Sequence, residues 1–295
     1  MLVMNPGETI DIDPCRVLVE VTEFDGKKLL EAYAKRQSRY ATVPFDPAGE
    51  ILRLYPGGVT IWSGFPGAGK TTLLRQFVCH CLARGSSVFL ASLEEDPENV
   101  LVNLAAVAAG CEMPNAHQVQ WLIDAFGERF RLWGKIGLAQ HRELLQVIRG
   151  LAVFGVKHAV IDSLMCLDIA NDDFEAQRNF ANLVAATARE MRIHIHLVAH
   201  PRKLISADQE LDINDVAGAR ELGGIADNVI FVRRAKNESP TADGTTPMII
   251  AVRKQRHGSG ATGNISGWYH RHLRQFHIDQ FPPHPTHYLP ADAYL

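Results

Sequence analysis

Residues 64–71 read GFPGAGKT and fit the pattern G-x-x-x-x-G-K-[ST] of a phosphate-binding loop. An apolar stretch at 59–62 (VTIW) precedes the loop, and an amphipathic stretch at 71–84 follows it. A strand, a glycine-rich turn and a helix in this order let backbone N–H groups and a helix N-terminus face phosphate oxygens. A glycine-rich turn without a ligand is the alternative, and the flanking elements favour the phosphate site.

Two side chains of this loop are expected to reach a bound nucleotide. Lys70 would contact the β- and γ-phosphates, and the hydroxyl of Thr71 would complete the coordination of Mg²⁺. We therefore predict a site for ATP, or another NTP, together with Mg²⁺. The residues predicted to surround the nucleotide are Gly64, Pro66, Gly67, Ala68, Gly69, Lys70, Thr71 and Thr72.

Apolar and amphipathic stretches alternate from residue 55 to about residue 276, as in a parallel sheet covered by helices. The predicted strands are 59–62, 88–92, 159–161, 193–198, 228–232 and 248–252, and helices are predicted at 71–84, 97–109 and 174–191. Most of these strands are too apolar to be half exposed, which places them inside the sheet. The predicted fold class is α/β, with a mostly parallel central sheet and helices on both faces.

The composition sets limits on the class of protein. The chain has 295 residues, of which 46% are hydrophobic and 21% charged, so disorder along its whole length is excluded. The net charge of -3 argues against a uniformly basic nucleic-acid binder, but not against a basic stripe inside a channel. Five cysteines without C-x-x-C spacing favour neither disulfides nor a structural zinc.

The chain ends and the cysteines suggest where the protein resides. No signal peptide precedes residue 15, and no apolar run approaches the about 20 residues of a membrane span. We expect a soluble, cytoplasmic protein in a reducing compartment, without a membrane partner. The expected domains are an N-terminal arm at 1–45, an ATPase core at 46–278 and a Pro-rich, loosely held tail at 279–295. In the arm we predict a strand at 16–20 and a helix at 27–40, followed by a linker around Pro44 and Pro47.

Two acidic residues follow predicted strands at the sheet edge that carries the phosphate loop. Asp162 ends one strand and is expected on the Mg²⁺ side of the site, although a strand-terminal Asp is also common as a helix cap. Glu94 follows another strand and is expected to polarise the attacking water. Glu95 and Asp96 are interpreted as N-terminal charges of the helix that begins at Pro97.

The order of the motifs resembles the RecA-like core of hexameric replicative DNA helicases of the DnaB and Twinkle type, over about residues 50–275. Five segments carry the resemblance: YPGGVT at 55–60, SLE at 92–94, IDS at 161–163, HIHLVAHPRK at 194–203, and KQRHG at 254–258 followed by Gly263. The phosphate loop is shared by very many ATPases, whereas the fourth and fifth segments are far more specific.

The resemblance implies roles for residues that spacing alone does not assign. His200 would sense the γ-phosphate, and Lys254 and Arg256 would enter the site of a neighbouring subunit, with Arg256 as the arginine finger. Without the resemblance, residues 254–257 would be a basic surface hairpin. His194 and His196 are interpreted as strand residues without a function.

The resemblance also implies how DNA is bound. Arg202 and Lys203 would belong to a loop that faces the channel of a ring and contacts phosphates without reading sequence. The acidic loop at about 168–178 is better interpreted as solvated. At Gly224 the family usually carries Gln, which is thought to link the nucleotide to the DNA loop. Arg220 or Glu221 would have to substitute for it.

These features predict an ATP-dependent helicase that forms a homohexameric ring and moves 5′ to 3′ on single-stranded or forked DNA. By the same resemblance the helix at 27–40 would pack on the adjacent subunit, the alternative being that it packs on its own core. A separate primase, loader or polymerase is an expected partner. The rival hypothesis is a RecA-like, nucleotide-switched ATPase of recombination or regulation without helicase activity. A loader or accessory subunit is a third hypothesis.

Overall fold

The computed structural model describes residues 2–5, 8–10, 25–37, 39–170, 173–201, 211–216, 220–235, 240–241, 244–257, 260–279, 284–289 and 291–294. The chain divides into two compact units, residues 1–39 and residues 40–295. Each unit is described by itself.

The first unit contains a short hairpin and one helix. Strands β1 (Leu2–Asn5) and β2 (Glu8–Ile10) pair antiparallel. Helix α2 (Gly26–Gln37) confirms the predicted helix with a slightly earlier end, and its apolar side chains Leu29, Leu30 and Tyr33 are exposed. The strand predicted at 16–20 lies outside the described residues.

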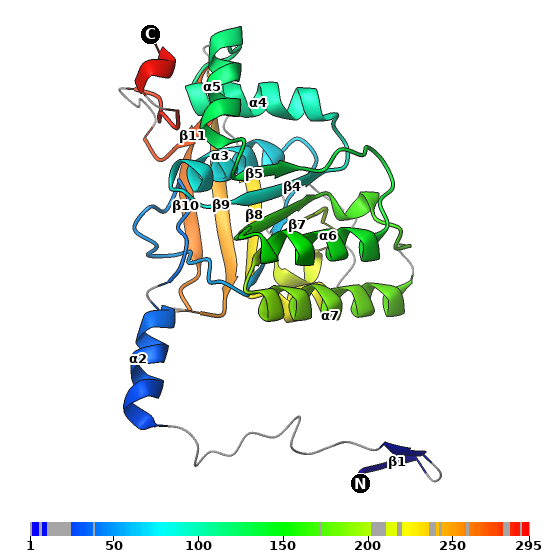
Figure 1. The fold of residues 1–295 in the computed structure, drawn as a ribbon. Coiled ribbons are helices and arrows are strands. Elements are labelled where there is room, and N and C mark those ends of the chain that lie inside the picture. The colour runs from blue at the N-terminus through cyan, green and yellow to red at the C-terminus, as the bar shows by residue number, and fades with distance from the viewer. Residues whose placement is uncertain are drawn as a thin grey trace. The chain divides into compact units, whose positions relative to one another are not determined.

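The second unit is built on a nine-stranded mixed sheet (Figure 1). Its strands are β3 (Val59–Ser63), β4 (Val88–Ser92), β5 (Phe130–Leu132), β6 (His158–Asp162), β7 (His194–Ala199), β8 (Asn228–Arg234), β9 (Thr245–Gln255), β10 (Gly263–His270) and β11 (Gln275–His277). The order across the sheet is β11-β10-β9-β8-β3-β7-β6-β4-β5. The six strands from β8 to β5 are mutually parallel, and β9, β10 and β11 continue the sheet antiparallel.

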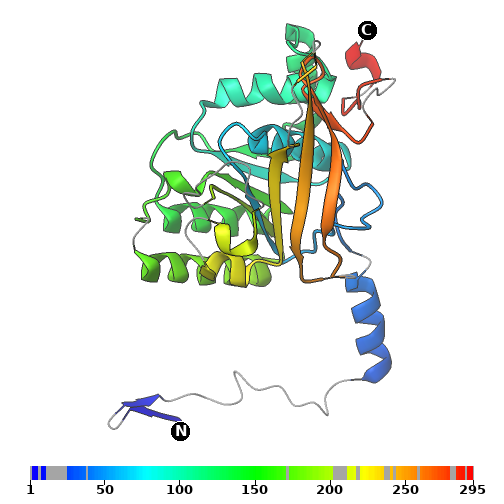
Figure 2. The ribbon, with the colours of Figure 1, turned by 180° about the vertical axis from the view of Figure 1, so that it is seen from behind.

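Helices cover both faces of this sheet, as expected (Figures 1 and 2). One face packs against α3 (Lys70–Ala83), α4 (Pro97–Ala109) and α5 (Ala116–Phe126). The other packs against α6 (His141–Val153), α7 (Phe174–Met191) and α8 (Arg220–Ile225). Three short 3₁₀ helices complete the unit: η2 (Leu164–Cys166), η3 (Ile213–Asp215) and η4 (Ala291–Tyr294).

The sheet has one apolar core on each face because successive side chains of a strand point in opposite directions. In β3, Trp62 packs with α3 and α4, whereas Val59 and Ile61 pack with α7. All five residues of β3 are buried, as are those of β4 and β6. Their continuous apolar sequences reflect burial on both faces.

The stretch around Pro44 and Pro47 was expected to act as a linker, but it belongs to the packed unit. Asp46 is buried, and its carboxylate accepts hydrogen bonds from the backbone N–H groups of Glu50, Ile51 and Leu52 at 2.6–3.0 Å. These bonds close a tight loop whose apolar side chains enter the core beside α3, among them Val43, Phe45, Leu52 and Leu54. Proline punctuates a turn here and does not mark a boundary.

The described part of the C-terminal tail is packed, which corrects the expectation of a loose segment. Tyr288 and Leu289 are buried, and the backbone N–H of Tyr288 donates to the carbonyl of Ala108 at 3.1 Å. The Gln76 amide on α3 bonds both the carbonyl of Phe276 at 3.0 Å and the Tyr288 hydroxyl at 3.3 Å. The tail thus completes the core next to α3, α4 and α5.

A hydrogen-bonded group of histidines lies inside the sheet. The Trp62 indole donates to Nδ1 of His196 at 3.2 Å, and Nε2 of His196 lies 3.2 Å from Nδ1 of His158. Nδ1 of His194 donates to the carbonyl of Tyr55 at 2.7 Å. Burial lowers the pKa of His158 to about 3 and that of His194 to about 4, and that of His196 well below its ordinary value. These rings are neutral core residues.

Four described cysteines, Cys79, Cys81, Cys111 and Cys166, are free thiols. Within the described part of the chain, no helix combines the length and the apolar character that crossing a membrane requires.

Candidate functional site

The phosphate loop joins β3 to α3 and depends on glycine at three positions. Gly64, Gly67 and Gly69 have φ values of 149°, 71° and 95°, which disfavour residues with a Cβ atom. A Cβ atom at Gly64 would lie 2.2 Å from the carbonyl oxygen of Val232 on the neighbouring strand β8. Glycine is therefore needed where the loop leaves the sheet, because β8 passes so close.

Lys70, at the first position of α3, is folded back over the loop. Its ammonium group donates to the carbonyls of Gly64 at 2.7 Å and Phe65 at 3.0 Å, and the residue is buried. Burial lowers the pKa of Lys70, and the negative charges of Asp162 and Glu94 partly offset this effect. The side chain is thus a positive charge in a poorly solvated place, where an anion would be attracted strongly.

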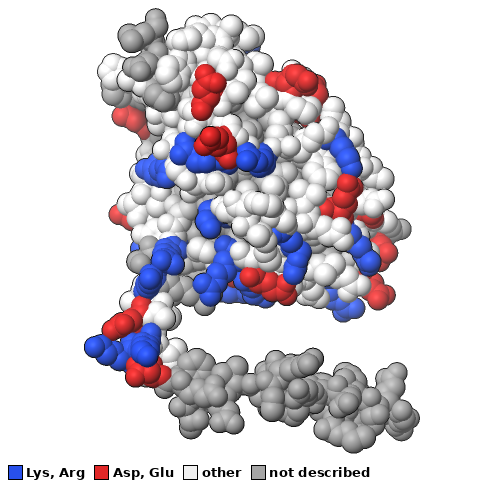
Figure 3. All heavy atoms as spheres, viewed as in Figure 1, with Lys and Arg blue, Asp and Glu red and all other residues white. Residues whose placement is uncertain are grey.

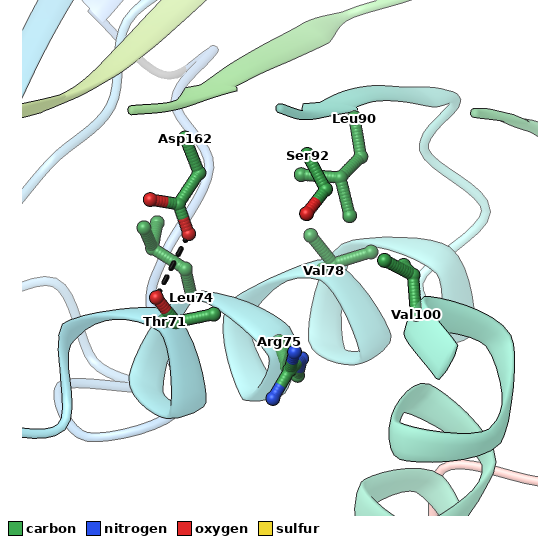
Figure 4. A pocket seen from close by; sticks show the side chains of 8 residues that line it. All are labelled: Thr71, Leu74, Arg75, Val78, Leu90, Ser92, Val100 and Asp162. Atoms are coloured by element: carbon green, nitrogen blue, oxygen red, sulfur yellow. Dashed lines mark hydrogen bonds between the residues drawn. The ribbon is translucent and has the colours of Figure 1, made fainter. Parts of the chain in front are cut away.

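Thr71 and Asp162 meet across the gap between α3 and β6. The Thr71 hydroxyl donates to Oδ2 of Asp162 at 2.9 Å (Figure 4). Burial raises the pKa of the Asp162 carboxyl, the Thr71 hydrogen bond lowers it, and the charge of Glu94 raises it. Side chains from α3, β4, α4 and β6 line a pocket at this point: Thr71, Leu74, Arg75, Val78, Leu90, Ser92, Val100 and Asp162.

These two residues fit the Mg²⁺ ion that a nucleotide would bring. A hydroxyl and a carboxylate are the oxygen ligands that Mg²⁺ prefers, usually with only one or two from the protein and the others from water and phosphate. The buried Asp162 carboxylate is penalised for its charge, which a cation beside it would relieve. Thr71 and Asp162 would hold the ion on the phosphate side of the loop.

Glu94 follows β4 at the same sheet edge. The backbone N–H of Leu93 donates to the carbonyl of Asp162 at 2.8 Å, which ties the end of β4 to the end of β6. Oε1 of Glu94 accepts a hydrogen bond from the Ser163 hydroxyl at 2.7 Å. The structure therefore brings together Glu94 and Asp162, which are 68 residues apart in the sequence.

The two acidic residues after Glu94 have different partners. Asp96 caps α4 as expected, since its side chain accepts a hydrogen bond from the backbone N–H of Asn99 at 3.0 Å. Glu95 instead pairs with the guanidinium of Arg75 on α3. Sequence analysis missed Arg75, although a helix places it four residues after Thr71 and so on the same face.

His200 lies just beyond β7 and is partly buried. Its pKa is lowered by burial and by the positive charge of Lys70, and raised less by the negative charge of Glu94. Since both charges act on the ring, His200 belongs to the same edge as the phosphate loop. This edge collects Lys70, Thr71, Glu94, Asp162 and His200 from four different strand ends.

Lys254 and Arg256 are placed at the opposite edge of the sheet. Ser63, the last residue of β3, is level with Phe231 on β8 and Ala251 on β9. Arg256 lies five residues further along the antiparallel strand, roughly 17 Å away at about 3.4 Å per residue. The structure does not bring these two cations to the phosphate loop of their own chain.

At that far edge, both cations bind the C-terminal end of α8. Lys254 donates to the carbonyls of Gly223 at 2.8 Å and Gly224 at 3.0 Å, and Arg256 donates to that of Gly224 at 2.9 Å. Carbonyls at a helix C-terminus have no partner within the helix and attract cations. Arg256 also contacts the buried carboxylate of Asp227 at 3.3 Å.

Two predicted features are only partly described. Arg202 and Lys203, the predicted DNA-binding residues, lie outside the described residues, as do the side chains of Arg220 and Glu221. Gly224 is exposed, and no atom lies within 4 Å of where its Cβ atom would be. The space would admit a side chain, so packing does not explain the glycine.

Comparison with known proteins agrees with the fold and the phosphate site. The solved ATPase domain of one replicative helicase matches with a TM-score of 0.70 and 17% identity, over 86% of this chain and 99% of that one. A DnaB-like replicative helicase, solved in a study of its interactions with primase, matches with a TM-score of 0.69 and 16% identity, over 87% of this chain and 68% of that one. At these identities the likeness shows the fold.

The expected RecA-like ATPase core of the DnaB type is thereby confirmed, and the enzyme is one that hydrolyses ATP. A family model described as "ATPase: KaiC" matches residues 50–262, which include the phosphate loop, Asp162 and Arg256. The chain therefore belongs to the KaiC family of ATPases.

Proposed function

We propose that this ATPase is a ring-shaped replicative helicase that moves on single-stranded DNA, 5′ to 3′, and unwinds the duplex ahead of it. The observation that carries the proposal is the placement of Lys254 and Arg256 at the sheet edge opposite their own phosphate loop. A cation so placed can complete a nucleotide site only in another copy of the chain. Repetition of such a head-to-tail contact closes a ring, here a hexamer.

In such a ring each nucleotide lies between two subunits. Lys70 binds the β- and γ-phosphates, and Thr71 with Asp162 holds Mg²⁺, which neutralises charge on the phosphate oxygens. Glu94 accepts a proton from water as the water oxygen bonds to the γ-phosphorus and the bond to the bridging oxygen breaks, releasing ADP and phosphate. His200 contacts the γ-phosphate, and Arg256 of the next subunit stabilises the charge of the transition state.

DNA binding is assigned to few residues in each chain. Positive and negative side chains are interspersed on the face in Figure 3, and the net charge is -3. Arg202 and Lys203, repeated around a central channel, would supply the phosphate contacts without a basic outer surface. The exposed Leu29, Leu30 and Tyr33 of α2 supply an apolar contact for the adjacent subunit.

The second candidate is a nucleotide-switched ATPase of recombination or regulation. The match to the KaiC family model favours it, because that family is described as ATPases and not as helicases. Glycine at position 224 also favours it, since the side chain thought to link nucleotide and DNA is missing.

A fork-unwinding assay separates the two. The substrate is a forked duplex with a 5′ single-stranded tail, at moderate salt with ATP and Mg²⁺, and electron microscopy with an ATP analogue and single-stranded DNA records the particle symmetry. The helicase predicts unwinding and six-membered rings or spirals around the DNA. Hydrolysis of ATP without unwinding, together with particles that exclude DNA, would refute it in favour of the switch. Added primase, loader or polymerase tests the expected partners.

A further inference from the structure

Ser163 is a buried residue that the sequence analysis left without a role. It follows Asp162 at the end of β6 and is 1% exposed. A hydroxyl buried this deeply requires a hydrogen-bond partner. Its partner is Oε1 of Glu94 at 2.7 Å, a charge-assisted bond between residues that are 69 positions apart.

This bond is the principal described contact of the Glu94 carboxylate. The only other one recorded for the described residues is the Cys166 thiol, at 4.0 Å from the same oxygen. The backbone beside Glu94 is anchored separately, through the bond from Leu93 to the carbonyl of Asp162. Two bonds therefore connect the ends of β4 and β6, one holding the backbone of the loop and the other its carboxylate.

The bond keeps the carboxylate on the phosphate side of the sheet edge. The negative charge of Glu94 acts on Lys70, Asp162 and His200, raising the pKa of each. Since Oε1 accepts from Ser163, Oε2 remains the oxygen that is available to a water molecule. A glutamate side chain has several rotatable bonds, and fixing its head group lowers the entropy cost of reaching the reactive geometry.

We propose that Ser163 is a positioning residue for ATP hydrolysis, whose hydroxyl holds Glu94 in the direction from which it receives the proton of the attacking water. This inference rests on the proposed role of Glu94. It concerns turnover and not nucleotide binding, because Ser163 bonds neither Lys70 nor Thr71.

The test is steady-state ATPase kinetics of the full chain carrying Ser163→Ala. We expect kcat to fall about tenfold, as for a misplaced catalytic group, while KM and the affinity for a fluorescent ATP analogue change less than about twofold. Ser163→Thr, which keeps the hydroxyl, should retain most of kcat. Ser63→Ala is the matched control, since Ser63 is also buried at a strand end of this edge but bonds no carboxylate.

A double variant distinguishes positioning from a general loss of structure. In the Glu94→Gln background, Ser163→Ala should lower kcat by less than about twofold, because two residues that act through one step are not additive. An equal loss in both backgrounds, or wild-type kcat in Ser163→Ala, would overturn the proposal. If Ser163→Ala does not fold, Ser163→Cys replaces it and should give an intermediate kcat, since a thiol is a weaker donor; wild-type kcat in that variant would also overturn it. A Glu94→Gln enzyme with wild-type kcat would instead refute the proposed role of Glu94.

Discussion

The two edges of the central sheet carry the charged residues of this protein in opposite ways. At the carboxyl edge of the parallel strands, the cation Lys70 lies within the electrostatic reach of two carboxylates, Asp162 and Glu94. At the other edge, Lys254 and Arg256 bind backbone carbonyls of α8. The first edge is arranged around an anion that the chain must bind, whereas the second stores cations that its own phosphate loop cannot use.

The difference follows from strand direction. All parallel strands end at one edge, so the residues after β3, β4, β6 and β7 converge there. Strand β9 is antiparallel, and its last residues therefore return to the edge where the parallel strands begin. One reversal of direction separates the finger residues from the phosphate loop by the length of a strand.

The largest expected effect comes from breaking the phosphate edge with Lys70→Ala. Both nucleotide binding and charge stabilisation depend on this ammonium group, so ATP turnover should fall by about 10⁴-fold or more. Phosphate release and analogue binding measure the two losses. Lys157→Ala, which removes an exposed lysine outside both groups of residues, is the control and should leave turnover unchanged. Substantial hydrolysis by Lys70→Ala would contradict the site assignment.

The comparison is sharpened by mixing subunits that are defective at different edges. Arg256→Ala alone should lower ATPase activity about a thousandfold, as for other arginine fingers. Arg256→Ala and Glu94→Gln subunits, mixed in equal amounts before assembly, should form intact sites at about one quarter of the interfaces of a head-to-tail ring. Recovered ATPase activity is the readout, and either variant mixed with itself is the control. No recovery at any ratio would show that Arg256 does not act in the neighbouring site.

The smallest expected effect concerns the histidines inside the sheet, between the two edges. Burial holds the pKa of His158 at about 3 and of His194 at about 4, whereas histidine in an unfolded chain titrates near about 6.5. Below about pH 6.5 the unfolded state binds protons that the folded state does not, so stability falls with falling pH. Each such histidine should contribute about 1.4 kcal/mol per pH unit.

Chemical denaturation between pH 7 and pH 5 measures this slope. His158→Asn should reduce it by the share of one histidine, and the exposed His284→Gln is the control that should not change it. A slope that is equal in all three proteins would show that these buried rings do not control acid stability.

Much of the phosphate edge could be predicted because its signals are local. The loop pattern, the apolar strands and the acidic residues that follow them each span a few positions, and parallel strands necessarily bring their ends together. Arg75 was missed because its partner Glu95 is fixed by the packing of α3 against β4 and not by a motif. Ser163 was missed because a hydroxyl carries no sequence signal for a carboxylate 69 residues away.

The regions around Pro44 and Tyr288 show the opposite case, in which local signals misled. Proline breaks helices and strands wherever it occurs, but it does not report whether the resulting irregular chain is packed. Burial of Val43 and Tyr288 against the α3 side of the core depends on apolar partners distant in the sequence.

The sequence by itself determined the phosphate site, the α/β class and the identity of the residues at the carboxyl edge, since periodicity and short motifs act over a few residues. Only the tertiary structure decided that β9 runs antiparallel, that Lys254 and Arg256 rest on α8, and that Ser163 holds Glu94. These features join residues about 30 to 70 positions apart, and their free energy comes from packing and hydrogen bonds that exist only once the sheet has formed.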